Sequence, residues 1–164
     1  RYTRTFTLLE SFDKQNVKSP VGTKTTNELT FEECQSAISK MKTDLMSRDE
    51  ASELFGMQRE HGLEQVIGSI YQTFGGDDLY PTIEDKAAHV LYLTIKDHPF
   101  SDGNKRVGSF LFVYFLNKSN YLFRENGENK INDNALVALA LLVAESNPKD
   151  KDLLINLIKQ LITN

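Results

Sequence analysis

The sequence predicts an all-α fold, a bundle of about six helices interrupted by one short β-hairpin. Apolar residues recur at spacings of three and four through most of the chain after Leu29, which is the period of helices with one buried face. The links between these stretches are short, and the alternation typical of strands is scarce. The length of 164 residues suits one domain with one catalytic or binding unit.

The N-terminal segment 1–28 differs in composition from the rest, with many Thr and Ser residues. We expect it to be a linker or docking tail, and the helical domain to span 29–164. Two local structures remain open for this segment. Alternating threonines would suit a strand, whereas apolar residues at every third position would share one face of a short helix: Phe6, Leu9 and Phe12.

The first predicted helix of the domain reaches about Met46. Thr30 and Glu33 have the spacing of a capping box, in which each side chain bonds to the backbone N–H of the other residue. A shorter helical piece is predicted over 49–55, and another helix over 63–74. The stripe of the first helix consists of Phe31, Cys34, Ile38, Met41 and Leu45.

A brief hairpin is predicted at 75–82, directly before the next helix. Its two glycines and two aspartates favour a turn, and the residue before Pro81 is biased toward extended backbone. Thr82 and Asp85 then repeat the capping spacing, which predicts a helix over 83–96.

Three more helices complete the predicted bundle. The stretch 104–117 is apolar nearly all round, which is typical of a central buried helix. Asn132 or Asp133 would cap a helix that reaches Glu145. The last helix is expected to open at 147–148, with proline in the first turn, where its missing N–H costs little.

Composition argues against several classes of function. Nineteen Lys plus Arg against 23 Asp plus Glu give a net charge of −4, so we expect neither a nucleic-acid partner nor attraction to anionic lipid. The longest apolar stretch, 107–116, is about half the length of a membrane span. The single Cys34 favours a reducing, cytoplasmic compartment. Arg1 stands in place of an initiator Met, so we expect a segment of a longer protein.

Segment 98–106 carries the residues best suited to chemistry, in the order His-Pro-Phe-Ser-Asp-Gly-Asn-Lys-Arg. Gly103 permits a tight turn, and the next residues open a helix whose N–H groups and dipole attract anions. Lys105 and Arg106 add positive charge at that same end. Cations there are unfavourable for a bare helix, which indicates that an anion such as a phosphate binds beside them.

Two other residues of this segment complete a reactive set. Asp102 offers a hard oxygen ligand for Mg²⁺, which typically takes one or two carboxylates together with substrate phosphates. His98 is a candidate general base. Proton removal, charge neutralisation and phosphate positioning are what transfer from a nucleoside triphosphate to a hydroxyl requires. We therefore predict ATP or another nucleoside triphosphate as co-substrate, with Mg²⁺ as cofactor.

Ordinary structural roles stand beside these chemical ones. Asp102 would serve equally as a helix N-cap, and Asn104 could cap the same helix while contacting phosphate. Lys105 could be a solvated helix residue, and Tyr80 could pack within the hairpin instead of touching substrate. Purely structural roles are expected for Cys34, His61, His89, Phe110, Phe112 and Phe115, with contact to a nucleotide base as the alternative for the three phenylalanines.

The motif at 98–106 resembles that of the Fic/Doc family, His-Pro-Phe-x-Asp-Gly-Asn-x-Arg. Its fixed positions would occur by chance in a chain this long about once in 10⁶. The resemblance covers roughly 58–121. Within it, the Gly-Gly-x-x-x-Tyr-Pro-Thr sequence at 75–82 resembles the flap that precedes the motif in this family. The resemblance implies a Fic-type helical bundle, in agreement with the helical period.

The resemblance also implies a role for each motif residue. His98 would deprotonate the target hydroxyl, and Asp102 would hold Mg²⁺. Asn104 and the backbone of 103–106 would cradle phosphates, while Arg106 would pair with them bidentately. Transfer would modify a hydroxyl of a target protein.

The flap is implied to bind that target protein by strand addition. Phe100 would be a core anchor that fixes the motif loop. The flap residues concerned are Gly75, Gly76, Leu79, Tyr80 and Pro81.

Two positions depart from the adenylylating members of the family. Lys105 stands where these usually carry Gly, and Ser109 stands where they carry a second Arg. Both differences resemble the Doc branch, which favours phosphoryl transfer. Two alternatives remain: transfer of AMP to a protein hydroxyl, and a catalytically silent module that binds a nucleotide or a partner.

The sequence contains no recognisable inhibitory motif. Many family members are inhibited by a helix with Ser/Thr-x-x-x-Glu-Gly/Asn, but no Ser or Thr here has Glu four residues later. Inhibition would come from an antitoxin-like partner, another part of the parent chain, or a contact that the sequence does not reveal. The resemblance suggests a bacterial source.

Overall fold

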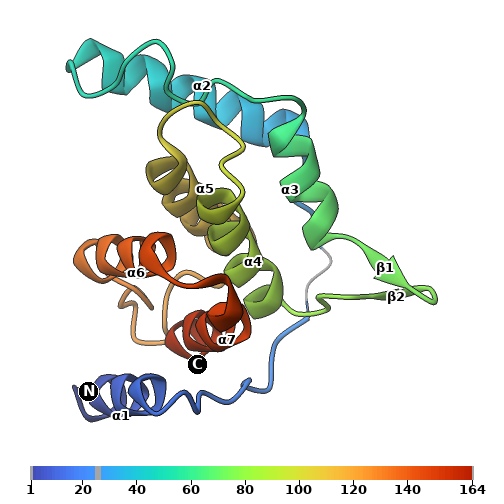
Figure 1. The fold of residues 1–164 in the computed structure, drawn as a ribbon, viewed down its shortest axis with the longest axis vertical. Coiled ribbons are helices and arrows are strands. Elements are labelled where there is room, and N and C mark those ends of the chain that lie inside the picture. Colours follow the sequence, from blue (N-terminus) through green and yellow to red (C-terminus); the bar gives the residue numbers. More distant parts are fainter. Residues whose placement is uncertain (1, 25–26, 164) are drawn as a thin grey trace.

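The computed structural model describes residues 2–24 and 27–163, which form seven α-helices, one 3₁₀ turn and one two-stranded hairpin (Figure 1). In chain order the elements are α1 (Tyr2–Asp13), α2 (Phe31–Ser47), α3 (Gly62–Ile70), β1 (Thr73–Phe74), β2 (Asp77–Asp78), α4 (Ile83–Lys96), α5 (Asn104–Lys118), α6 (Asp133–Glu145), η1 (Pro148–Asp150) and α7 (Lys151–Ile162). The predicted all-α bundle with a short hairpin is confirmed.

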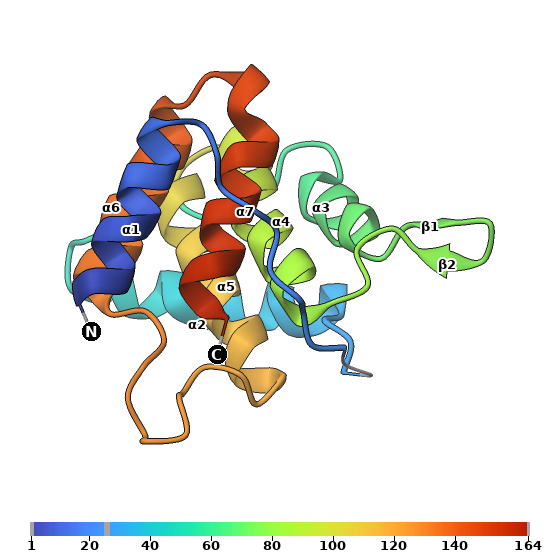
Figure 2. The same cartoon turned by 90° about the horizontal axis from the view of Figure 1, so that it is seen from below.

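Helices α4 and α5 pack against each other at the centre of the molecule. Eleven of the 14 residues of α4 are buried, so α4 shares the central position that the sequence predicts for α5 alone. Helices α6 and α7 lie along one side of this pair, and α1 lies beside α7 (Figure 2). Both views show the hairpin projecting away from the bundle.

Three helices begin at the N-terminal caps that the sequence predicts. Thr30 and Glu33 form the capping box: the Glu33 amide donates to Thr30 Oγ1 at 3.2 Å, and the Thr30 amide donates to Glu33 Oε2 at 2.9 Å. Thr82 Oγ1 accepts from the amide at the third position of α4 at 3.0 Å. Asn132, rather than Asp133, caps α6.

One predicted helical stretch is wrong, and another is predicted four residues too long. Residues 49–55 form no helix, because Phe55 is buried beneath the motif loop and its backbone pairs with Asp102. Helix α3 ends at Ile70 instead of Phe74. Residues 73–74 pair with 77–78, which needs extended backbone and ends the helix before them. Phe74, the last residue of the predicted apolar stripe, therefore lies in β1, where it is 83% exposed.

The N-terminal segment takes the helical alternative, α1, and contacts the bundle. Asn156 Nδ2 of α7 donates to the Val17 carbonyl at 3.1 Å. Further along, the Thr23 carbonyl accepts from the Ile83 amide at 2.7 Å, beside the end of the hairpin. Residues 25 and 26 of the predicted tail lie outside the described residues, as does Arg1. A linker or docking role for 1–28 stays a prediction.

The helices are modest in length, and α2, with 17 residues, is the longest within the described part of the chain. None of the helices in that part combines the length and the apolar character needed to cross a membrane.

Candidate active site

The six motif residues predicted to carry chemistry line one pocket of about 280 Å³. The pocket lies where the C-terminal ends of α4 and α6 meet the start of α5. Its lining consists of Ile95, His98, Ser101, Asp102, Gly103, Asn104, Lys105, Arg106 and Ala144. The fold therefore brings the candidate base, the carboxylate and the cationic helix start together.

His98 follows the last turn of α4 and is exposed to the pocket. Its φ of 49° is left-handed, which turns the chain out of the helix. The ring Nδ1 lies 3.1 Å from the Lys96 carbonyl oxygen. Because a carbonyl only accepts, Nδ1 is the donor of this bond and Nε2 is the proton acceptor of the neutral ring. This tautomer suits a general base.

Asp102 presents a carboxylate that is 47% exposed at the pocket. It does not cap α5, because Gly103 occupies the N-cap position and no side chain bonds there. Asp102 Oδ2 lies 3.5 Å from Ser52 Oγ and 3.9 Å from Arg106 Nη2. One exposed carboxylate fits a Mg²⁺ ion that arrives with nucleotide phosphates. No cluster of three or more His, Cys, Asp or Glu groups suited to a metal occurs among residues 2–24 and 27–163.

The start of α5 is electropositive. Gly103 has a φ of 85°, and its carbonyl accepts from the Val107 amide at 2.7 Å, which closes the first turn. The first N–H groups of a helix have no acceptor within the helix. This first turn has no acidic residue, and Lys105 and Arg106 are both exposed there. The arrangement attracts an anion.

The side chain of Asn104 locks the motif loop. Its Oδ1 accepts from the Phe100 amide at 3.0 Å, and its Nδ2 donates to the Phe100 carbonyl at 2.9 Å. Phe100 itself is buried in the core, in agreement with the predicted anchor role. Because the amide group of Asn104 is engaged in this way, a phosphate contact at this position would come from the backbone N–H.

Arg106 is held from two sides. Nη1 donates to the Glu50 carbonyl at 2.6 Å, and the guanidinium carbon lies 4.6 Å from the centroid of the Phe55 ring. Arg106 also lines the pocket. Sequence reasoning predicts a phosphate partner for this guanidinium but neither of these protein partners.

Residues 50–59, which we call the strap, form the part of the site that sequence reasoning missed. The Gly56 amide donates to the Asp102 carbonyl at 3.0 Å, and the Ser101 amide donates to the Met57 carbonyl at 2.8 Å. Contacts between the strap and the motif leave no pattern in a short stretch of sequence, because they join residues that are far apart in the chain. Arg106 and its strap partner Glu50, for example, are 56 positions apart. The helix predicted over 49–55 covers part of the strap and gives no sign of its contacts with the motif.

The flap residues do not line the motif pocket. They lie beyond the start of α4, whereas the motif follows its end, and 14 helical residues separate the two by about 21 Å. Leu79 and Tyr80 instead border another cavity, of about 390 Å³, between α4 and α7. Gly75 and Gly76 form the turn between β1 and β2, whereas Leu79, Tyr80 and Pro81 follow β2, so the strands pair earlier in the chain than the hairpin predicted at 75–82.

Two side chains of α4 hold the hairpin. Lys86, whose side chain is 4% exposed, donates from Nζ to the Tyr80 carbonyl and pairs with Asp78 Oδ2 at 3.3 Å. The Tyr80 ring stacks on His89 with centroids 3.6 Å apart. Tyr80 therefore packs on His89, and His89 is buried, which agrees with the structural role expected for it.

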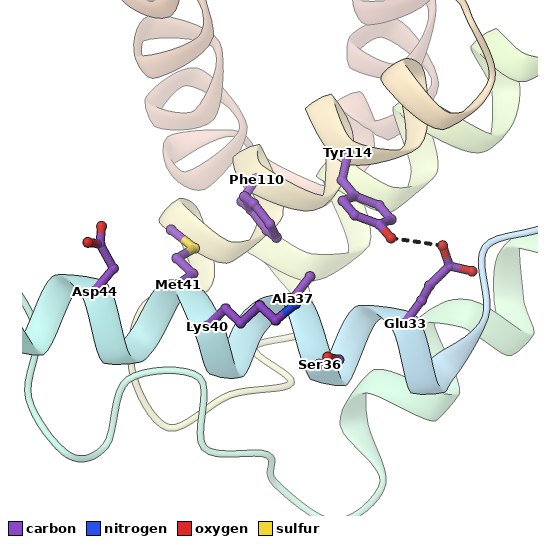
Figure 3. Close-up of a pocket in the computed structure, with 8 residues that line it drawn as sticks. All are labelled: Glu33, Ser36, Ala37, Lys40, Met41, Asp44, Phe110 and Tyr114. Carbon is purple, nitrogen blue, oxygen red and sulfur yellow. Dashed lines mark hydrogen bonds between the residues drawn. The ribbon is translucent and has the colours of Figure 1, made fainter.

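A larger pocket, of about 540 Å³, lies between α2 and α5 away from the motif (Figure 3). Phe110 and Tyr114 of α5 face α2 across it, and the Tyr114 hydroxyl donates to Glu33 Oε1 at 3.0 Å. Phe112 and Phe115 are buried in the core as predicted. None of the residues that line this pocket belongs to 98–106.

Burial shifts the pKa of Cys34 and of His89, both of which lie outside the motif pocket. It raises the pKa of the Cys34 thiol to about 12, which agrees with the predicted inert, packed role. It lowers the pKa of His89 to about 4, and the nearby Lys151 contributes to the same shift. His89 is therefore neutral at physiological pH.

Comparison with known proteins identifies the family. Residues 28–116 match the model of the Fic/DOC family, which extends the region of resemblance back over α2 and the strap. Neither the curated proteins nor the solved structures give a significant match. Members of the family use ATP, typically with Mg²⁺, to transfer nucleotide-derived groups to protein hydroxyls. Because the match covers more than half of the chain and includes the whole motif, the protein belongs to the Fic/DOC family.

Proposed function

We propose that the protein transfers a phosphoryl group from ATP, or another nucleoside triphosphate, to a hydroxyl of a target protein. One observation carries this proposal: His98, Asp102 and the electropositive start of α5 line the same pocket of about 280 Å³. They supply a proton acceptor, a metal carboxylate and a phosphate site, which are the components that hydroxyl attack on a phosphate requires.

His98 acts on the attacking group. A Ser, Thr or Tyr hydroxyl of the target gives its proton to Nε2 as its oxygen forms a bond to the γ-phosphorus. The bond from phosphorus to the bridging oxygen breaks, and ADP leaves. The Nδ1 bond to the Lys96 carbonyl holds the ring and stabilises the imidazolium that forms.

The phosphates bind at the start of α5. Backbone N–H groups of 103–106 and the cations of Lys105 and Arg106 hold them in line with the attacking oxygen. Asp102 would hold Mg²⁺, which neutralises phosphate charge when bound. Asn104 keeps the loop in place through its two bonds to Phe100.

Two sequence positions favour phosphoryl over AMP transfer. Lys105 is exposed at the rim of the pocket, where adenylylating relatives usually carry Gly. Ser109 lies one turn further along α5 and brings no second arginine to the site. AMP transfer is the second candidate, and a silent binding module is the third.

The hairpin is the proposed docking site of the target. Phe74 and Leu79 are 83% and 48% exposed there, which offers apolar contacts to an added strand. The length of α4, about 21 Å, corresponds to roughly six residues of extended chain. In a docked target, the modified hydroxyl would therefore lie at least about six residues from the segment that pairs with the hairpin. An antitoxin-like partner is proposed as inhibitor, and the bacterial cytoplasm as location.

Labelled ATP distinguishes these functions. The protein is incubated with bacterial lysate and Mg²⁺, together with ATP labelled at either the α or the γ phosphate, and labelled protein is detected on a gel. Label from γ alone is expected. Label from α would assign AMP transfer, and the absence of both labels, with ATP binding retained, would favour the silent module.

A further inference from the structure

We propose that Phe55, which lies outside the motif, is a positioning residue that orients Arg106 toward the nucleotide phosphates. The inference rests on the proposed function, in which Arg106 pairs with phosphate. It adds a residue of the strap to the site and assigns that residue a measurable effect on nucleotide affinity.

The ring of Phe55 supports the flat face of the Arg106 guanidinium. Phe55 is fully buried, and the guanidinium carbon lies 4.6 Å from the ring centroid, within the range of a cation–π contact. At the edge of the same guanidinium, Nη1 donates to the Glu50 carbonyl at 2.6 Å. A guanidinium has five N–H donors in a planar fork. Fixing one face and one N–H restricts the orientation of the remaining donors of a side chain that lines the pocket.

The same ring also supports the turn before α5. A Cβ placed on Gly103 would lie 2.5 Å from Cδ2 and Cε2 of Phe55, so the backbone of the turn rests directly on the ring. This turn sets the direction of the first N–H groups of α5. Phe55 therefore contacts both parts of the proposed phosphate site, its backbone and its cation.

The strap is well placed to hold the ring still. Backbone bonds join Gly56 to Asp102 and Met57 to Ser101, on the C-terminal side of Phe55. On its N-terminal side, Lys42 Nζ of α2 donates to the Glu53 carbonyl. A long arginine side chain loses rotamer freedom when it binds a ligand, and holding it beforehand reduces that loss. Removing the ring should therefore weaken nucleotide binding without removing any group that touches the nucleotide.

The test is a double-mutant cycle on nucleotide affinity. Titration calorimetry with Mg²⁺ and a non-hydrolysable ATP analogue gives Kd for the wild type, Phe55→Leu, Arg106→Ala and the double variant. We expect Phe55→Leu to raise Kd by about 3- to 10-fold, the loss of a cation–π contact. Arg106→Ala should raise it by about tenfold or more. In the Arg106→Ala background, Phe55→Leu should change Kd by less than about twofold, because the ring then has no guanidinium to orient.

Phe112→Leu is the matched control for loss of a buried ring. Phe112 is also fully buried, lies on α5 and does not line the motif pocket. Urea unfolding should show destabilisation of both variants, while only Phe55→Leu changes Kd. Phe55→Met provides a second ringless variant should Phe55→Leu fold poorly.

The outcomes separate the inference from the proposed function. A wild-type Kd in both ringless variants, with Arg106→Ala weakened, would overturn the role of Phe55 alone. An equal effect of Phe55→Leu with and without Arg106 would also overturn it, since the ring would then act through something else. Absence of nucleotide binding by the folded wild type would overturn both.

Discussion

His98 and Gly103 both adopt left-handed backbone conformations, with φ of 49° and 85°. The first turns the chain out of α4, and the second turns it into α5. The sequence predicted the turn at Gly103 because glycine adopts positive φ without strain. It did not predict that this residue would displace Asp102 from the cap. An N-cap side chain needs extended backbone directly before the helix, and Gly103 occupies that position.

Replacing Gly103 by Ala should destabilise the fold by about 2–4 kcal/mol, from left-handed strain together with overpacking. The added Cβ would lie 2.5 Å from two atoms of the buried Phe55 ring. Gly127→Ala is the matched control, because Gly127 has the same φ of 85° and nothing within 4 Å of its Cβ position. Urea unfolding of both variants measures the difference. Equal losses of stability would contradict the close packing of Gly103 on Phe55.

Side-chain partners were the least predictable part of the site. The motif indicated which residues line the pocket, but the engagement of the Asn104 amide with Phe100 and the stacking of Arg106 on Phe55 depend on the folded loop. The Phe55 contact in particular joins the motif to the strap. A single sequence contains no periodic signal for such a pair.

Helix α4 connects the two predicted functional elements. Lys86 and His89 in its first half hold the hairpin, and His98 directly follows its last turn. Start signals such as the capping box at Thr30 were predictable because they are local. The C-terminal end of α3 and the non-helical path of the strap were not predictable. Strand pairing overrides the helical period after α3, and the burial of Phe55 overrides it in the strap.

Replacing Lys86 by Met should loosen the hairpin, since it removes the bond to the Tyr80 carbonyl and the pair with Asp78. The amide of Leu79, which donates to the Gln72 carbonyl at 2.9 Å, reports on this change. We expect its hydrogen exchange to accelerate by about tenfold, corresponding to about 1.4 kcal/mol of local stability.

Lys96→Met is the control on the same helix, because Lys96 Nζ bonds instead to the Ser146 carbonyl at 2.5 Å. It should leave the exchange of Leu79 unchanged. Equal exchange in the wild type and the Lys86 variant would show that this lysine does not hold the hairpin.

Because of His89, the free energy of unfolding should decrease as the pH falls below neutral. Burial lowers its folded pKa to about 4 from an ordinary 6.5, so only the unfolded chain binds a proton between these values. Stability is therefore lost as the pH falls from 6.5 toward 4, at up to about 1.4 kcal/mol per pH unit. His89→Phe keeps a ring against Tyr80 and should flatten this slope. Urea unfolding at pH 7, 6 and 5 compares the two proteins, and identical slopes would contradict the assignment.

At the scale of the whole molecule, helix α6, which lies beyond the family match, contributes to the lining of the motif pocket. The match ends at residue 116, yet Ala144 of α6 lines the motif pocket. Lys96 Nζ holds the end of α6 there through the Ser146 carbonyl. The fold class and a single motif pocket were predictable from helical period and motif spacing. The separation of hairpin and pocket was not, because it follows from the length and direction of α4 in the folded bundle.

In the proposed reaction, His98 accepts the proton of the target hydroxyl during nucleotide-dependent modification. His61 offers a matched control, since it is an exposed histidine with a left-handed φ of 60° outside the motif pocket. The decisive measurement is the rate of ³²P transfer from γ-labelled ATP to lysate protein by the wild type, His98→Ala and His61→Ala, with folding verified by circular dichroism. We predict near-wild-type labelling by His61→Ala and a loss of about 10²-fold or more in His98→Ala. Near-normal labelling by a folded His98→Ala protein would contradict the role of this residue as the base.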